Sequence, residues 1–135
     1  MSIDVGLKME ERKTGRVLLR FGDYITKFHT HVLFATNKII KARPDVVRRF
    51  LKGWFEAIAH MRRNKAATVK TGMRVAKLSK AVSSAAYDRI MPMFSDNGKF
   101  DKASLDVVAE GLVVTKIFKK KPDMSKLYTE KFLPK

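Results

Sequence analysis

The amino-acid sequence predicts an α/β fold that is predominantly helical, with two short strands and about four to five helices. The strands are predicted from two short apolar runs, RVLLRF at residues 16–21 and HVLFAT at residues 31–36. The helices are predicted from apolar residues that recur every three or four positions after residue 44. A chain of 135 residues suffices for one domain with a core of its own.

The run at residues 31–36 is the better strand candidate, because Val32, Leu33 and Phe34 follow one another without a polar residue. Continuous apolar character is typical of a strand that is buried on both faces. Two strands do not make a stable sheet of that kind by themselves. We therefore expect this strand to need neighbours that the chain does not supply.

The clearest helix begins at Pro44, whose missing N–H is no loss in the first turn, and Asp45 complements the helix dipole there. Asn37 is expected to cap a short helical stub before it. The apolar residues of the helix recur with helical spacing and predict its buried stripe: Val47, Phe50, Leu51, Trp54, Phe55 and Ile58.

Further helices are expected over residues 2–13 and about 65–78, from a Ser79 cap to near Pro92, and after an Asp101 cap. Their inward faces are predicted to carry Val69, Met73, Ala76, Val82, Ala86, Ile90, Met93, Leu105, Val108, Ala109, Leu112 and Val113. The basic tail can dock on the body through Leu127, Tyr128, Phe132 and Leu133.

The net charge is the outlier of the composition, since 29 Lys and Arg against 13 Asp and Glu give +16. Such a charge suggests an anionic partner. There is no cysteine, which excludes disulfides, thiolate metal sites and cysteine nucleophiles. No apolar run is long enough to span a bilayer, and the N-terminal residues lack the pattern of a secretory signal. A chain expressed as written is therefore expected to stay in the cytoplasm.

Three stretches in order carry a resemblance to a known family: ATNKIIKARPDVVRRFLKGWFEAIAHMRRN, DNGKFDKASLDVVAEGLV and PDMSKLYTEKFLP. They resemble the C-terminal part of the periplasmic substrate-binding proteins of ABC transporters, in the group that binds thiamine precursors, nitrate, sulfonates and taurine. No single stretch is a strong motif, and the ordered series over roughly residues 15–134 is more specific. The matching positions are Pro44, Val47, Phe50, Gly98, Asp101, Asp123, Ser125, Leu127 and Phe132.

The chain also departs from that family. Gly53 stands where a residue such as Ala is usual, and Asn64-Lys65 replaces a frequent Asn-Pro pair. The charge is higher than expected of these proteins, and the family chain is more than twice as long. The resemblance therefore implies a C-terminal fragment, from a truncated gene product, an internal start or a shortened chain.

The family has two α/β lobes with a small organic molecule or anion in the cleft between them. By resemblance, residues 1–25 would end the second lobe, residues 26–36 would be the return crossover, and residues 37–135 would be the helical C-terminal part of the first lobe. The fragment alone is expected to bind no solute well. Its implied partners are the solute, the ABC permease, and a missing lobe or a second copy that covers an exposed sheet edge, in a periplasmic parent.

Candidate site residues come from the segment before the first helical stub. His29 and His31 alternate on one face, a spacing that can hold a metal ion, yet only His60 remains as a further histidine. Ordinary loop histidines are the simpler interpretation, so no metal and no cofactor is expected. By family position the residues expected to border the ligand cleft are Tyr24, Phe28, His29, Thr30, His31 and Thr36.

The sequence contains no recognisable paired carboxylates, Ser/His/Asp arrangement or phosphate loop, so an enzyme is not expected. The alternative function is a small basic helical nucleic-acid-binding protein. Its candidate phosphate contacts are Arg62, Arg63, Lys70, Arg74, Lys77, Lys80 and Lys119 to Lys121. These residues are spread over several helices, so a solvated basic surface is the competing interpretation.

Overall fold

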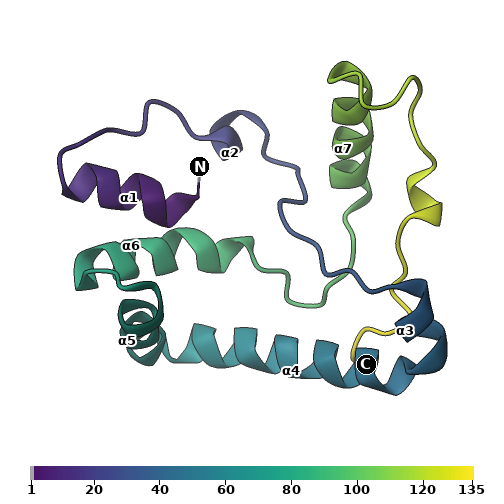
Figure 1. Cartoon of the computed structure of the whole chain (residues 1–135), viewed down its shortest axis with the longest axis horizontal. Helices are drawn as coiled ribbons and strands as arrows, with labels where there is room; N and C mark the ends of the chain where they lie inside the picture. Colours follow the sequence, from purple (N-terminus) through teal and green to yellow (C-terminus); the bar gives the residue numbers. More distant parts are fainter. Residues whose placement is uncertain (1) are drawn as a thin grey trace. The chain divides into compact units, whose positions relative to one another are not determined.

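The computed structural model describes residues 2–135 as helices joined by irregular segments. In that part of the chain 60% of the residues are helical and no strand is present. Figure 1 shows the elements in order: α1 (Ile3–Glu11), α2 (Phe21–Tyr24), α3 (Asn37–Ala42), α4 (Pro44–Arg63), α5 (Lys65–Ala76), α6 (Lys80–Ile90), the 3₁₀ helix η1 (Met91–Met93), α7 (Lys102–Val114) and the 3₁₀ helix η2 (Met124–Lys126).

The α/β prediction with two short strands is wrong. Residues 16–20 are irregular and Phe21 begins the single turn α2, while residues 31–36 form no ladder with any described segment. A strand exists only through hydrogen bonds to a neighbour, and an apolar run cannot supply that neighbour itself. The expected burial also fails, because Val32 and Leu33 are exposed and Phe34 is 93% exposed. With no sheet in the described chain, the expected exposed sheet edge is absent too.

The helices expected over residues 2–13 and after residue 44 are confirmed, and their ends follow local chemistry. Ser79 and Asp101 cap α6 and α7 as expected, accepting hydrogen bonds from the N–H groups of Val82 and Ser104. Helix α6 ends at Ile90, before Pro92. One cap differs from the expectation: Thr36 caps α3, accepting from Ile39 N at 3.3 Å, and Asn37 is the first helical residue.

The chain divides into two compact units, and the division falls inside α4 between Lys52 and Gly53. Unit 1 comprises residues 1–19 and 53–96, and unit 2 comprises residues 20–52 and 97–135.

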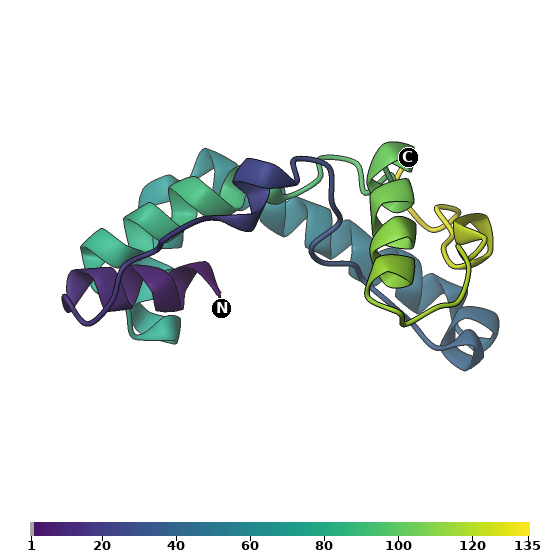
Figure 2. The same cartoon turned by 90° about the horizontal axis from the view of Figure 1, so that it is seen from above.

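Unit 1 is built around α6, which packs against α1 on one side and α5 on the other (Figures 1 and 2). Its core contains Leu7 of α1 with Val82 and Ala86 of α6. The Tyr87 hydroxyl donates to the Met61 carbonyl at 2.9 Å and thereby links α6 to the end of α4. These contacts bury one face of each short helix, which is what stabilises helices of this length.

Gly72 allows α5 and α6 to approach closely. A Cβ atom at this position would lie 2.6 Å from the Ser83 Oγ atom, which is closer than such atoms come in proteins. The Ser83 hydroxyl is buried and donates to the Val69 carbonyl at 2.9 Å, so it cannot move without losing that bond. The α5–α6 contact therefore requires glycine at residue 72.

Unit 2 is held by aromatic contacts among segments far apart in the sequence. The Phe100 ring lies 5.2 Å from the His29 ring and 4.5 Å from the Tyr128 ring, centre to centre. The Phe100 N–H donates to the Glu130 carboxylate at 2.8 Å. Helix α7 lies beside the segment that carries η2, as Figure 2 shows. Leu105, Ala109 and Phe132 are the buried apolar residues of this unit.

The chain buries little apolar surface for its size. Nine hydrophobic residues are buried among those described, and no large side chain is fully buried. The accessible area is 10846 Å², against about 7,200 Å² for a typical monomer of this mass. Many large apolar side chains are therefore left exposed.

The predicted apolar face of α4 is an example of this limited burial. Ile58 is its one buried member, Val47, Leu51 and Phe55 are half-buried, and Phe50 is 56% exposed. Trp54 is exposed and packs edge-on against Phe94. In the other helices, Val69, Val82, Ala86, Leu105 and Ala109 are buried as expected, whereas Met73, Ala76 and Met93 are exposed. The tail docks through Phe132, with Leu127 exposed.

We predict that Gly72→Ala destabilises unit 1 by about 1–3 kcal/mol, because the new methyl group collides with the Ser83 hydroxyl. Gly53→Ala is the matched control, since its Cβ would meet no atom within 4 Å; alanine should stabilise α4 by up to about 1 kcal/mol there. Urea denaturation followed by Trp54 fluorescence measures both effects. Equal stability of the two variants would contradict the proposed close approach.

Candidate functional site

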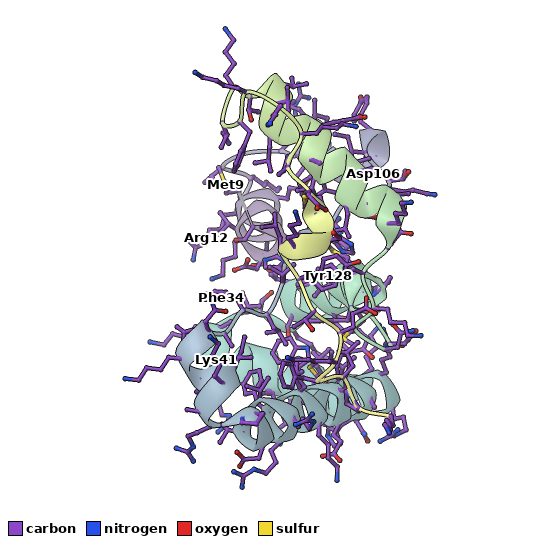
Figure 3. All side chains as sticks on the ribbon, turned by 90° about the vertical axis from the view of Figure 1, so that its right-hand side faces the viewer. Met9, Arg12, Phe34, Lys41, Asp106 and Tyr128 are labelled. Carbon is purple, nitrogen blue, oxygen red and sulfur yellow. The ribbon has the colours of Figure 1, made fainter. Side chains whose placement is uncertain are left out.

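The six candidate cleft residues lie between the end of α2 and the start of α3, within unit 2. None of them lines either of the two pockets described below. We call residues 21–34 the apolar segment, because many of its large apolar side chains are exposed. These are Phe21, Tyr24, Ile25, Phe28, Val32, Leu33 and Phe34. Figure 3 shows Phe34 projecting from the ribbon into open space. The segment therefore offers an exposed apolar surface.

His29 is the candidate with the most contacts. Its Nε2 atom lies 3.3 Å from the Asp101 carbonyl oxygen, and its ring packs edge-on against Phe100. Because a carbonyl oxygen can only accept, Nε2 carries the proton of this hydrogen bond. His29 thus joins the apolar segment to the start of α7, which is a structural role.

The other five candidates contact residues close to them in the sequence or are exposed. Thr36 caps α3, and the Thr30 hydroxyl lies 3.2 Å from Nδ1 of the neighbouring His31. Phe28 packs edge-on against Phe21 at 5.3 Å, and Tyr24 is exposed. Thr30 and His31 are exposed, as are the polar residues Asp23, Thr26 and Lys27 of the same segment.

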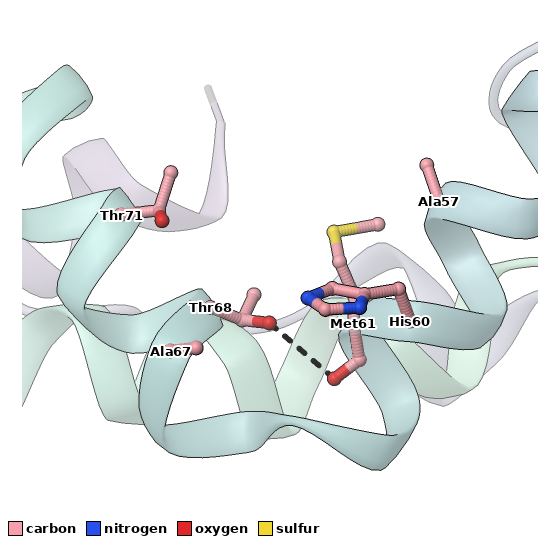
Figure 4. Close-up of a pocket in the computed structure, with 6 residues that line it drawn as sticks. All are labelled: Ala57, His60, Met61, Ala67, Thr68 and Thr71. Atoms are coloured by element: carbon pink, nitrogen blue, oxygen red, sulfur yellow. Dashed lines mark hydrogen bonds between the residues drawn. The ribbon is translucent and has the colours of Figure 1, made fainter.

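One pocket lies in unit 1 where α4 meets α5, and Figure 4 shows its six lining residues. Its volume is about 390 Å³, and its lining is Ala57, His60, Met61, Ala67, Thr68 and Thr71. The Thr68 hydroxyl donates to the carbonyls of Asn64 and Met61, so its hydrogen is used within the fold. The remaining lining is largely apolar, and we assign this pocket to the junction between the two helices.

A second pocket, of about 510 Å³, lies in unit 2 between α4 and the tail. Sequence analysis missed this site, because it joins α4 to residues about eighty positions further along the chain. The one available signal was the pair Arg48 and Lys52, which lie one helical turn apart on α4. Its lining consists of Arg48, Lys52, Lys131, Phe132, Leu133, Pro134 and Lys135.

Two aspartates have a lowered pKa because of the caps that they form. The hydroxyl and N–H of Ser104, each 2.7 Å away, hold the pKa of Asp101 below its ordinary value. The Ser125 hydroxyl, 2.6 Å away, does the same to the pKa of Asp123, with help from Lys126. Asp101 therefore caps the N-terminus of α7, and Asp123 caps that of η2.

The candidate phosphate-binding cations are divided between the two units. Arg62 is engaged with Asp96 and donates to the Phe94 carbonyl, and Lys121 pairs with Glu110 at 2.6 Å. Lys70, Arg74 and Lys77 are exposed at spacings of four and three residues along α5 and its C-cap. Helical geometry places Lys70 and Arg74 on one face, and Lys77 follows at the left-handed C-cap.

No group of three or more metal-ligating side chains occurs within residues 2–135. None of the helices in the same range combines the length and the apolar character that crossing a bilayer requires. Comparison with known proteins finds no matching family model, no matching curated protein and no matching solved structure.

We predict that His29→Ala loosens the start of α7, because it removes the ring contact with Phe100 and the hydrogen bond to the Asp101 carbonyl. A loss of about 1 kcal/mol should speed amide hydrogen exchange in residues 102–114 about fivefold. His31→Ala is the control, since its partner is the adjacent Thr30. Unchanged exchange in the His29 variant would show that the aromatic contact does not support α7.

Proposed function

We propose that the chain acts within the solute-binding component of an ABC import system and that it works together with further polypeptide. The observation that carries this proposal is the exposed surface, above all the apolar segment, next to helices that bear the family's ordered positions. The parent would close on a small organic molecule or anion and deliver it to a membrane permease.

The local structure at the resemblance positions supports the proposal. Pro44 is the first residue of α4, and Gly98 has a φ of 72°, a conformation that favours glycine. Asp101 and Asp123 cap α7 and η2, and Phe132 is 5% exposed. Each of these residues has a backbone or packing task that explains its type.

The apolar segment supports the need for a partner. Val32, Leu33 and Phe34 are exposed in succession, and such a run is unfavourable in water. Thr30 and His31 lie beside it and offer polar groups to a bound solute. A cleft closed by a covering polypeptide would place these side chains at its border, whereas the chain alone leaves them in solvent.

We predict that the native polypeptide containing these residues binds one solute saturably, whereas residues 1–135 alone bind none. Isothermal titration calorimetry with a thiamine-precursor pyrimidine, nitrate, an alkanesulfonate and taurine tests this. In the native polypeptide His31→Ala should weaken binding by about tenfold, the value of one lost hydrogen bond to a charged or polar ligand group. His60→Ala, on α4, is the matched control. Failure of the native polypeptide to bind any of these solutes, or equally tight binding by the isolated chain, would refute the proposal.

A second candidate function, nucleic-acid binding, is favoured by the exposed cations Lys70, Arg74 and Lys77 in unit 1. Cations at this spacing can follow a phosphate backbone, and the net charge of +16 would speed encounter with it. The nearby Val75 side chain is exposed and gives the face some apolar surface.

If this function holds, labelled DNA should bind at low salt, and the affinity should fall about 50-fold between 50 and 200 mM salt for three phosphate contacts. Fluorescence anisotropy measures it for single and duplex strands. Lys70→Gln/Arg74→Gln removes two phosphate contacts and should reduce the slope of log affinity against log salt concentration by nearly two. Arg12→Gln/Lys13→Gln removes the same charge elsewhere in unit 1 and should leave the slope nearer to that of the parent chain. Equal slopes for the two variants would assign the binding to net charge alone.

A further inference from the structure

The pocket between α4 and the tail is lined by basic and apolar side chains. Four of its seven lining side chains are basic, three are apolar, and none is acidic. Arg48 and Lys52 come from α4, while Lys131 and Lys135 come from the tail. Positive charge is thus gathered from two distant parts of the sequence around one hollow in unit 2.

The Phe132 ring holds two of these cations in place. The Arg48 guanidinium lies 5.1 Å from the ring centre, and the Lys131 Nζ atom lies 4.9 Å from it. Both distances suit a cation–π contact. Because Phe132 is almost fully buried, the ring itself is fixed, and it fixes the position of the two charges.

Two acidic residues close in sequence to the pocket lining have partners outside it. Asp45 pairs with Arg49 at 2.8 Å, and the Glu130 carboxylate accepts the Phe100 N–H at 2.8 Å. Like charges brought together repel one another, and a bound anion would remove that repulsion. Arg48 and Lys131, held on one ring, therefore suit a ligand with more than one negative charge.

We propose that this pocket binds a phosphomonoester that carries an apolar substituent. Arg48 supplies a planar fork of donors that matches two phosphate oxygens, and the lysines add point charges. Leu133, Pro134 and Phe132 provide the apolar lining for the substituent. The phosphate can belong to a soluble organic phosphate or to the headgroup of a phosphatidic acid in a membrane. This site is separate from the proposed solute cleft and from the basic face of α5.

The test uses the full chain with two probes, phenyl phosphate in solution and phosphatidylcholine vesicles that contain phosphatidic acid. We expect saturable binding of phenyl phosphate, tighter than that of inorganic phosphate, or cosedimentation with the phosphatidic acid vesicles. Arg48→Gln/Lys131→Gln should weaken the observed binding by at least about tenfold, because two charge-assisted contacts are lost. Both residues are exposed, and far-UV circular dichroism checks that the variant folds.

Lys119→Gln/Lys120→Gln is the matched control, since it removes the same charge from unit 2 at two exposed residues outside the pocket lining. The affinity of this control for the probe should stay within about twofold of that of the parent chain. Binding to one probe alone identifies the source of the phosphate. Equal weakening in both double variants, or binding to neither probe, would overturn the proposal. Equal affinity for inorganic and phenyl phosphate would overturn the role of the apolar lining.

Discussion

Residues 26–35 share no backbone hydrogen bond with any described segment, and this lack of a hydrogen-bonding neighbour determines what the chain can form. Backbone N–H and C=O groups need partners, and a helix is the element that finds them within one segment. The segments that can form helices do so, and α4 is 20 residues long. Residues 26–35 do not form a helix, because their β-branched and aromatic residues favour extended structure.

The helices and their ends could be predicted from sequence because their causes are local. Pro44 has no N–H to lose in a first turn, and the Ser79 and Asp101 side chains accept hydrogen bonds from N–H groups three residues later. Burial could not be predicted in the same way. The periodicity of α4 identifies the apolar face, but it does not tell whether a neighbour covers that face, so Ile58 is buried while Phe50 is not.

The site residues show the same limit. His29 and His31 alternate along the sequence, yet His29 packs on Phe100, some seventy residues away, and His31 faces its neighbour Thr30. The pocket around Phe132 depends on an equally distant contact, between α4 and the tail. Composition revealed the excess of positive charge, whereas the places where it gathers depend on tertiary contacts that no local pattern encodes.

The charge and the apolar surface together indicate what kind of polypeptide could cover this chain. A second copy would bring a further +16 charge to the apolar segment, and that repulsion opposes self-association. A polypeptide with an acidic rim around an apolar patch would be attracted over the range of a Debye length and would then bury Val32, Leu33 and Phe34. The basic side chains of Lys27, Lys38 and Lys41 flank this run in the sequence and would meet such a rim. The physical chemistry of the exposed surface thus favours a different, acidic partner over a homodimer.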